Sequence, residues 1–162
     1  ISEREKKYWE ETKNVKRPGS RAFRKAASDT VGAVALDRHG DICVGTSTGG
    51  TFKKHPGRVG DSPLIGCGSY ADNTVGGVST TGWGEAMIKV VMAKTVIDIL
   101  DMNGGDPQAA AEGGIEILKR KVDGNGGVIV LNRLGKPGVA FNTPRMARAY
   151  MTDEMRDPFV GV

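Results

Sequence analysis

The chain has 162 residues and a hydrophobic content of 38%, which fits one soluble globular domain, and no apolar run approaches the ~18 residues that a membrane-spanning helix needs. Its net charge of +4 comes wholly from residues 1–29, which hold nine basic and five acidic side chains, whereas the two signs cancel from Thr30 onward. A nucleic-acid-binding protein would carry its basic excess on the folded surface, so the composition argues against both membrane insertion and nucleic-acid binding.

Residues 1–29 differ in character from the rest of the chain. Residues 2–11 are predicted to form a short charged helix, a proline-glycine pair follows, and a polar basic stretch continues to Ser28. This composition is typical of a linker, because few of its side chains can join a hydrophobic core. Ile1 is not an initiator methionine, so we expect the protein to begin further upstream.

The cysteines and the first residues bear on the cellular compartment. Cys43 and Cys67 do not make a disulfide framework, and we expect two small, buried, unpaired side chains. The first residues are charged and lack the apolar stretch of a secretory signal. Both features predict a reducing, cytoplasmic environment.

The first elements after the linker are predicted to form a hairpin. Residues 30–37 are an apolar strand and residues 42–48 a second strand, joined by a turn over 38–41. Residues 49–74 are rich in glycine and proline, and we expect a long functional loop there. Residues 75–80 are predicted to form a further strand.

Two helices are predicted next, followed by more strands. Apolar residues at spacings of three and four predict one helix over 85–102. Asp106 as N-cap and Pro107 at the first helical position begin a second helix, which runs to about Lys121. The predicted elements that follow are strands over 126–131 and 138–142, a short segment over 144–151 and a polar tail.

This order of elements predicts an α+β fold, with helices packed on one face of an antiparallel sheet. The other face of the sheet would then lie bare. We therefore expect a partner sheet to cover it, from another chain or from an upstream half of the same protein.

Thr30 stands at the first position of an apolar strand, directly after the linker. If the Asp29–Thr30 bond is cut, Thr30 gains a free α-amine beside its own hydroxyl. Such an amine has a pKa near ~7.7–8.0 and can act as a general base at neutral pH. One residue then supplies both nucleophile and base. A threonine that begins a strand is usually structural, so the hypothesis depends on the residues around it.

Five segments resemble, in the same order, the plant-type asparaginase/isoaspartyl aminopeptidase branch of the N-terminal-nucleophile hydrolases. The resemblance covers essentially the whole of residues 30–143. No single segment would suffice, but five in order make a chance match improbable. The segments are TVGAVALD at 30–37, TSTGG at 46–50, GRVGDSPLIG at 57–66, YADN at 70–73 and STTGWGE at 79–85.

The resemblance implies catalytic roles for four of these residues. Thr30 would attack the side-chain carbonyl of the substrate. Thr48, which ends the second hairpin strand, would lie across from Thr30 and orient its hydroxyl. The hydroxyl of Thr81 and the N–H of Gly82 would form an oxyanion hole, and one such donor is typically worth ~10²–10³ in rate.

The resemblance also implies a substrate clamp. Arg58 would bind the α-carboxylate of an amino acid and Asp61 its α-ammonium group. Their spacing alone would favour a surface salt bridge, and only the resemblance favours the clamp. A carboxylate in the role implied for Asp61 asks for a substrate with a free α-amine, which favours L-asparagine and β-aspartyl dipeptides over internal peptide bonds.

Activation by self-cleavage is implied as well. The hydroxyl of Thr30 would attack the carbonyl of Asp29, where the family often has glycine, and the resulting ester would hydrolyse. Residues 1–29 would be the C-terminal tail of an α-subunit, and residues 30–162 the β-subunit. The expected fold is a four-layer αββα sandwich, completed by an upstream α-subunit half from the same precursor.

The implied assembly is a dimer of αβ units, a heterotetramer. No organic cofactor and no metal site in this chain are expected, although the family often has a structural alkali cation in the α half. Three alternatives remain: a glycosylasparaginase, a taspase-like threonine endopeptidase and a non-enzymatic, unprocessed scaffold or interaction module. Asp29–Thr30 fits the endopeptidase, whereas Asp61 argues against it, because an internal peptide bond offers no α-ammonium group.

Overall fold

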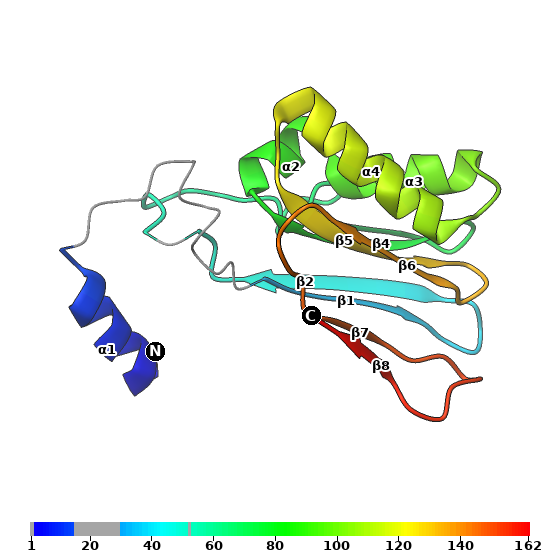
Figure 1. Cartoon of the computed structure of the whole chain (residues 1–162), viewed down its shortest axis with the longest axis horizontal. Helices are drawn as coiled ribbons and strands as arrows, with labels where there is room; N and C mark the ends of the chain where they lie inside the picture. Colours follow the sequence, from blue (N-terminus) through cyan, green and yellow to red (C-terminus); the bar gives the residue numbers. More distant parts are fainter. Residues whose placement is uncertain (1, 15–29, 52) are drawn as a thin grey trace.

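The computed structural model describes residues 2–14, 30–51 and 53–162 (Figure 1). The predicted helix over 2–11 is confirmed as α1 (Glu3–Thr12). Asp29 and the residues 15–28 before it lie outside the described residues, so cleavage before Thr30 stays a prediction.

The predicted hairpin is confirmed as β1 (Thr30–Leu36) and β2 (Ile42–Thr48), which pair antiparallel. Its turn is closed by Asp37, whose Oδ1 accepts hydrogen bonds from the backbone N–H of His39 at 2.7 Å and of Asp41 at 2.9 Å. This side chain satisfies backbone donors that the turn leaves unpaired. The resulting register places Thr30 directly opposite Thr48.

A separate four-stranded sheet has the order β3-β4-β5-β6, and every neighbouring pair is antiparallel. The predicted α+β class is therefore confirmed in its antiparallel form. The expectation of an uninterrupted loop over 49–74 is wrong, because β3 lies within it. This short strand exists through its pairing with β4, which local sequence does not reveal. The strands are β3 (Ser69–Asp72), β4 (Gly76–Gly82), β5 (Gly126–Asn132) and β6 (Pro137–Phe141).

The single helix predicted over 85–102 is wrong, because the structure has two helices, α2 (Gly84–Val90) and α3 (Met92–Met102). They meet at Val91, which takes the left-handed conformation with φ 47° and ψ 55°. The break is stabilised from outside the helix, because backbone carbonyls of the loop before β3 accept hydrogen bonds from N–H groups in the first turn of α3. Apolar periodicity continues through the break because both helices lie over the same sheet face.

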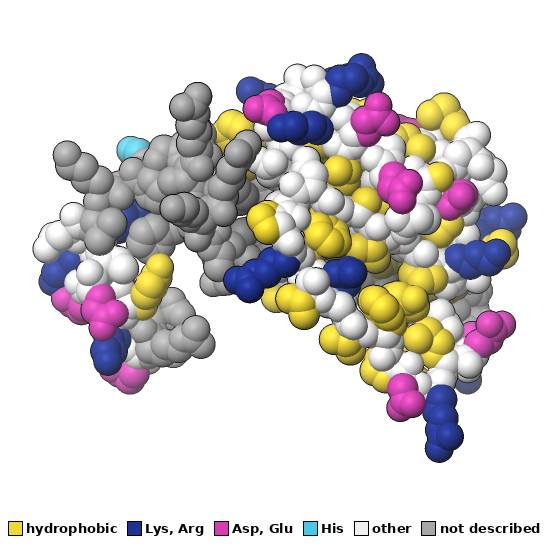
Figure 2. Space-filling model, viewed as in Figure 1, with side chains coloured by type: hydrophobic (Ala, Val, Ile, Leu, Met, Phe, Trp, Pro, Cys, Tyr) yellow, Lys and Arg dark blue, Asp and Glu magenta, His cyan; other side chains and the backbone are white. Residues whose placement is uncertain are grey.

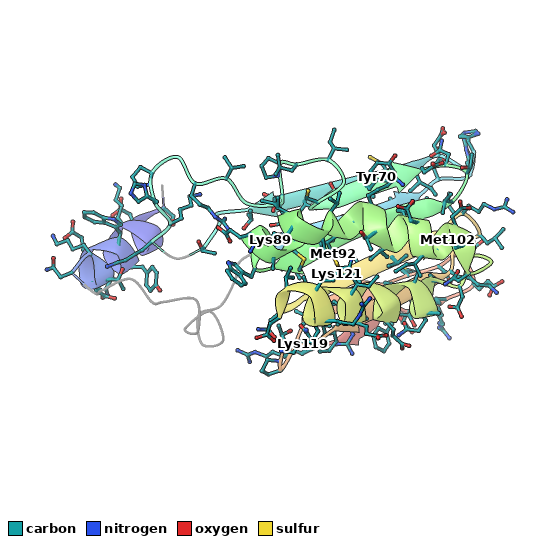
Figure 3. All side chains as sticks on the ribbon, turned by 90° about the horizontal axis from the view of Figure 1, so that it is seen from above. Tyr70, Lys89, Met92, Met102, Lys119 and Lys121 are labelled. Atoms are coloured by element: carbon teal, nitrogen blue, oxygen red, sulfur yellow. The ribbon has the colours of Figure 1, made fainter. Side chains whose placement is uncertain are left out.

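The second predicted helix is confirmed as α4 (Pro107–Val122), with the Asp106 side chain accepting from the backbone N–H of Gln108 and of Ala109. Figure 3 shows α3 and α4 side by side over the sheet, with Met92 where α3 begins. Within the described ranges, no helix is long and apolar enough to cross a membrane. The core lies between these helices and the sheet, and its largest fully buried side chains are Met87, Met92, Leu100, Leu118, Val78, Val96 and Val128.

The opposite face of the sheet is covered at β4 by the chain's own hairpin, which lies below the sheet in Figure 1. A Cβ added to Gly77 would lie 2.7 Å from Val34 Cγ1 and 2.9 Å from Val44 Cγ1. The hydroxyls of Thr46 and Ser79 are 2.7 Å apart and link the two layers. The expectation of a bare face is thus corrected, because the predicted hairpin strands form a second layer and are not part of the main sheet.

The short segment predicted over 144–151 contains the strand β7 (Arg148–Tyr150), and the part predicted as a polar tail contains β8 (Phe159–Gly161). The two strands pair antiparallel in a hairpin that the sequence did not predict. The rings of Tyr150 and Phe159 stack at 5.0 Å. Arg148 lies over Phe141 at 5.2 Å, which attaches the hairpin to the end of β6. Figure 2 shows hydrophobic side chains gathered in the lower part of the view, over this hairpin.

The two cysteines differ in environment. Both are free thiols, as expected, but Cys43 is exposed and Cys67 is buried. Burial raises the pKa of the Cys67 thiol, and the nearby charge of Asp61 adds to this effect. The expectation that both are buried is therefore wrong for Cys43, because that side of β2 faces away from the sheet.

Two adjacent glycines in α4 provide a matched test of the packing. Gly113→Ala should raise the free energy of unfolding by about 0.5–1 kcal/mol, because a helical glycine is entropically costly and its Cβ would meet Ile99 only at 3.4 Å. Gly114→Ala should lower it by about 1–3 kcal/mol, because its Cβ would lie 2.4 Å from Val96 Cγ2. Chemical denaturation of both variants measures the difference, and equal effects would contradict the described contact of α3 and α4.

Candidate active site

Thr30 and Thr48 face one another at the open end of the β1–β2 hairpin. The Thr30 hydroxyl donates to Thr48 Oγ1 at 3.3 Å, and the Gly50 N–H donates to the same oxygen at 2.9 Å. Thr48 is thereby held in place by the backbone of the turn that follows it. The structure brings these two predicted residues into direct contact.

The packing of the hairpin on the sheet brings Thr81 and Gly82 to the same end. Contacts run in antiparallel order along the two strands, with Gly32 against Ser79 and Val34 against Gly77. Continuing this order by two residues leads from Gly32 to Thr30 on β1 and from Ser79 to Thr81 on β4. Thr30 therefore lies at the end of the hairpin next to the C-terminal end of β4.

Gly82 occupies a position that admits no side chain. Its φ is +146°, and an added Cβ would lie 2.5 Å from the Asn125 carbonyl oxygen and 2.6 Å from Gly126 Cα. Both neighbours are backbone atoms of the segment that lies beside β4, so they cannot move aside as the end of a flexible side chain could. Glycine is required here for the close approach of β4 and β5 at the point where α2 begins.

Asp61 is a buried carboxylate, with 7% of its surface exposed. The Thr80 hydroxyl donates to Asp61 Oδ2 at 3.0 Å. Burial raises the pKa of Asp61, while the Thr80 hydrogen bond and the nearby charge of Arg58 lower it in part. Among the described residues, Asp61 forms no salt bridge. A buried anion of this kind suits a cationic ligand.

Arg58 pairs with Glu85, a partner that the sequence interpretation did not assign. Arg58 Nε donates to Glu85 Oε1 at 2.7 Å, and Nη2 donates to Oε2 at 2.9 Å. The hydrogen bond raises the pKa of Arg58 and lowers the pKa of Glu85. Glu85 stands within one of the quoted motifs, but 27 positions separate it from Arg58, so no local spacing indicated the pair.

Gly84 and Gly50 connect these residues into one site. A Cβ added to Gly84 would lie 2.8 Å from Arg58 Nη2 and 2.9 Å from Asp61 Oδ1, so both charged groups converge there. A Cβ added to Gly50 would lie 3.4 Å from Arg58 Nη1. Since the Gly50 N–H also bonds Thr48, the clamp residues adjoin the pair of threonines.

The arrangement contains a hydroxyl nucleophile candidate, two candidate oxyanion donors, and a cation and an anion that both lie against Gly84. No group of three or more His, Cys, Asp or Glu side chains that could hold a metal ion occurs in the part of the chain described. Acyl transfer on a zwitterionic substrate is the chemistry that this set of groups can perform.

Comparison with known proteins confirms the resemblance. The family model described as asparaginase matches residues 1–160. A probable isoaspartyl peptidase/L-asparaginase of Drosophila pseudoobscura pseudoobscura is 45% identical over 128 residues, which are 79% of this chain and 39% of that protein. The isoaspartyl peptidase/L-asparaginase of Xenopus laevis is 42% identical over 154 residues, which are 95% of this chain and 49% of that protein.

A plant-type L-asparaginase of Pyrococcus abyssi is 40% identical over 173 residues, with coverage of 99% of this chain and 56% of that protein. The chain thus spans about half the length of the curated relatives it matches. The family model covers nearly every position, including all the residues of the described site. The chain belongs to the asparaginase family.

Proposed function

We propose that the protein hydrolyses the side-chain amide of L-asparagine and the isopeptide bond of β-aspartyl dipeptides through an acyl-enzyme on Thr30. The observation that carries this proposal is the position of Thr30. It begins β1, contacts Thr48 through its hydroxyl, and lies at the end of the hairpin beside the C-terminal end of β4. The names of the relatives, isoaspartyl peptidase/L-asparaginase and plant-type L-asparaginase, support the same reaction.

Acylation begins when the free α-amine of Thr30 takes the proton of its own hydroxyl. The oxygen attacks the side-chain carbonyl carbon of the substrate, and the hydroxyl of Thr81 and the N–H of Gly82 stabilise the resulting oxyanion. The proton passes to the leaving nitrogen, the C–N bond breaks, and ammonia or an amino acid departs. Thr48 keeps the Thr30 hydroxyl oriented through the contact between their oxygens.

Deacylation uses the same groups in reverse. Water attacks the aspartyl ester and gives a proton to the Thr30 amine, the oxyanion forms again, and the C–O bond to Thr30 breaks. The amine returns its proton to the threonine oxygen. L-Aspartate leaves, and the free enzyme is restored without any other reactant.

The substrate class follows from the charged residues. Arg58 offers a fork of N–H donors to the α-carboxylate, and buried Asp61 offers an acceptor to the α-ammonium group. An internal aspartyl residue has neither group free, so Asp61 would stay buried without a counter-ion. This cost favours free asparagine and β-aspartyl dipeptides over internal peptide bonds.

Activity requires a free Thr30 amine, so we propose self-cleavage at Asp29–Thr30. Residues 1–29 then end an α-subunit, and residues 30–162 form the β-subunit. An upstream half of the same precursor would complete the four-layer αββα sandwich, in a dimer of αβ units. Exposed apolar groups support this association, with Val31 at 72% on the outer side of β1 and Val160 at 70% on β8.

The proposal is tested on the complete gene product by intact mass and N-terminal sequencing, followed by assays of ammonia from L-asparagine and of L-aspartate from a β-aspartyl dipeptide. We expect a new N-terminus at Thr30 together with both activities. A protein that stays uncut after prolonged incubation and releases neither product would refute the proposal.

Asp61→Asn should separate substrate binding from stability. Loss of the anion should raise the KM for L-asparagine by about 10–100-fold, because a charged hydrogen bond to the α-ammonium is lost. Steady-state kinetics measures this change, and an unaltered KM would remove Asp61 from the clamp.

The same variant should be more stable than the wild type at neutral pH. The pKa of Asp61 is raised in the folded state, so folding favours the protonated carboxyl. Stability is therefore lost as pH rises from the ordinary carboxyl range through the raised pKa, and the loss is complete above it. The asparagine side chain does not ionise, so thermal unfolding of Asp61→Asn should show a weaker decrease over this range.

A further inference from the structure

The Arg58–Glu85 pair fixes the orientation of a binding group. Two parallel hydrogen bonds join one edge of the guanidinium to both carboxylate oxygens, at 2.7 and 2.9 Å. Arg58 is the more deeply buried partner, with 15% of its side chain exposed against 43% for Glu85. A bidentate contact sets the plane of the guanidinium as well as its position, which a single hydrogen bond cannot do.

The donors of Arg58 divide between two edges. Of its five N–H groups, Glu85 accepts the one on Nε and one on Nη2. On the adjacent edge, one N–H of Nη1 and the second N–H of Nη2 form another fork that matches a carboxylate in geometry. Both nitrogens of this edge lie close to positions without side chains, since added Cβ atoms would lie 2.8 Å from Nη2 at Gly84 and 3.4 Å from Nη1 at Gly50.

Gly60 also helps to hold the Arg58 guanidinium in this orientation. A Cβ there would lie 2.6 Å from Arg58 Nη1 and 3.1 Å from Cζ, so the guanidinium packs against bare backbone. Glu85 is the second residue of α2, and Gly84, the first residue of the same helix, lies against Asp61. The start of α2 therefore fixes the position of Arg58, through Glu85, relative to Asp61, through Gly84.

We propose that Glu85 is a positioning residue, which holds Arg58 so that its second fork points to the α-carboxylate of the substrate. The inference rests on the proposed function and deepens it. Glu85 acts through Arg58 and does not contact the substrate, because its own negative charge would repel the α-carboxylate. Because Glu85 occupies one fork, Arg58 can bind one substrate carboxylate in one orientation, beside the α-ammonium site at Asp61.

If Glu85 competed with the substrate for Arg58, removal of its charge would change the KM for L-asparagine in the opposite direction. If Glu85 occupied the place of the substrate carboxylate on Arg58, removal of its charge would vacate that place and the KM for L-asparagine would fall. If Glu85 positions Arg58, the guanidinium loses its support and the KM rises. The sign of the change in KM therefore decides between the two roles.

The experiment compares Glu85→Gln and Glu85→Asp with the wild type in the complete gene product. Glu85→Gln should raise the KM for L-asparagine by about 10-fold and change kcat by less than about 2-fold, the loss expected for one charge-assisted contact. Glu85→Asp keeps the charge on a shorter side chain and should restore part of the affinity. Glu116→Gln, at an exposed position of α4, is the matched control and should leave both constants unchanged.

Binding of the product gives a readout that does not depend on turnover. L-Aspartate should raise the melting temperature of Glu85→Gln less than that of the wild type, because the same clamp binds both ligands. An unchanged or lower KM in Glu85→Gln would overturn the inference, as would equal stabilisation by L-aspartate. A wild type that neither hydrolyses L-asparagine nor binds L-aspartate would instead refute the proposed function.

Discussion

Replacing Thr30 with alanine should abolish hydrolysis of both substrates, with a loss in kcat of about 10³–10⁶-fold. The variant lacks the hydroxyl that forms the acyl-enzyme, while the hairpin around it keeps its backbone pairing with Thr48. The same oxygen is needed for self-cleavage, so the precursor should also stay intact. Ammonia release and intact mass measure the two effects in one preparation.

Thr30→Ser is the matched control for this experiment. Serine keeps a hydroxyl and an α-amine on the same residue, so cleavage and part of the activity should remain. Circular dichroism of both variants checks that the fold persists. Substantial turnover by Thr30→Ala would assign the nucleophile to another residue.

Gly82→Ala should lower the free energy of unfolding by about 3 kcal/mol, a loss that joins backbone strain to a steric clash. The φ of +146° disfavours any side chain, and the added Cβ would meet the Asn125 carbonyl oxygen at 2.5 Å. The shift of backbone needed to relieve this contact would also move the N–H that we assign to the oxyanion hole. Chemical denaturation measures the first effect and kcat the second.

The control for Gly82 is the same substitution at Gly113, where the added methyl meets only ordinary contacts. Gly113→Ala should stabilise the protein, so a general intolerance of alanine for glycine would be excluded. If Gly82→Ala unfolds at the same denaturant concentration as the wild type, the close approach of β4 and β5 at Asn125 is absent in solution.

Sequence patterns predicted the elements that local chemistry defines. The hairpin of β1 and β2 follows from alternation and a turn that Asp37 closes, and α4 follows from its Asp106 cap. Both depend on neighbours a few positions apart in the chain. The break at Val91 was missed because the loop that stabilises it comes from elsewhere in the sequence and leaves the apolar period intact.

The candidate site likewise contains residues that the sequence predicted and one contact that it did not. Motifs predicted Thr30, Thr48, Arg58 and Asp61 as members of one site, and the structure brings them together. Glu85 was missed as a partner of Arg58 because a pair separated by 27 positions leaves no periodic trace. Long-range contacts of this kind depend on how α2 is set against the preceding loop, which the sequence alone does not display.

The hydroxyl contact between Thr46 and Ser79 joins residues 33 positions apart, on two different layers. Thr30 thus acquires its neighbours on β4 only after the two intervening strands and their loops have folded, and such long-range contacts form slowly. Under the proposed self-cleavage, a nascent or misfolded chain would keep its Asp29–Thr30 bond and remain inert. Activation would then follow completed folding in time, so each cut chain would be one that had already assembled its active site.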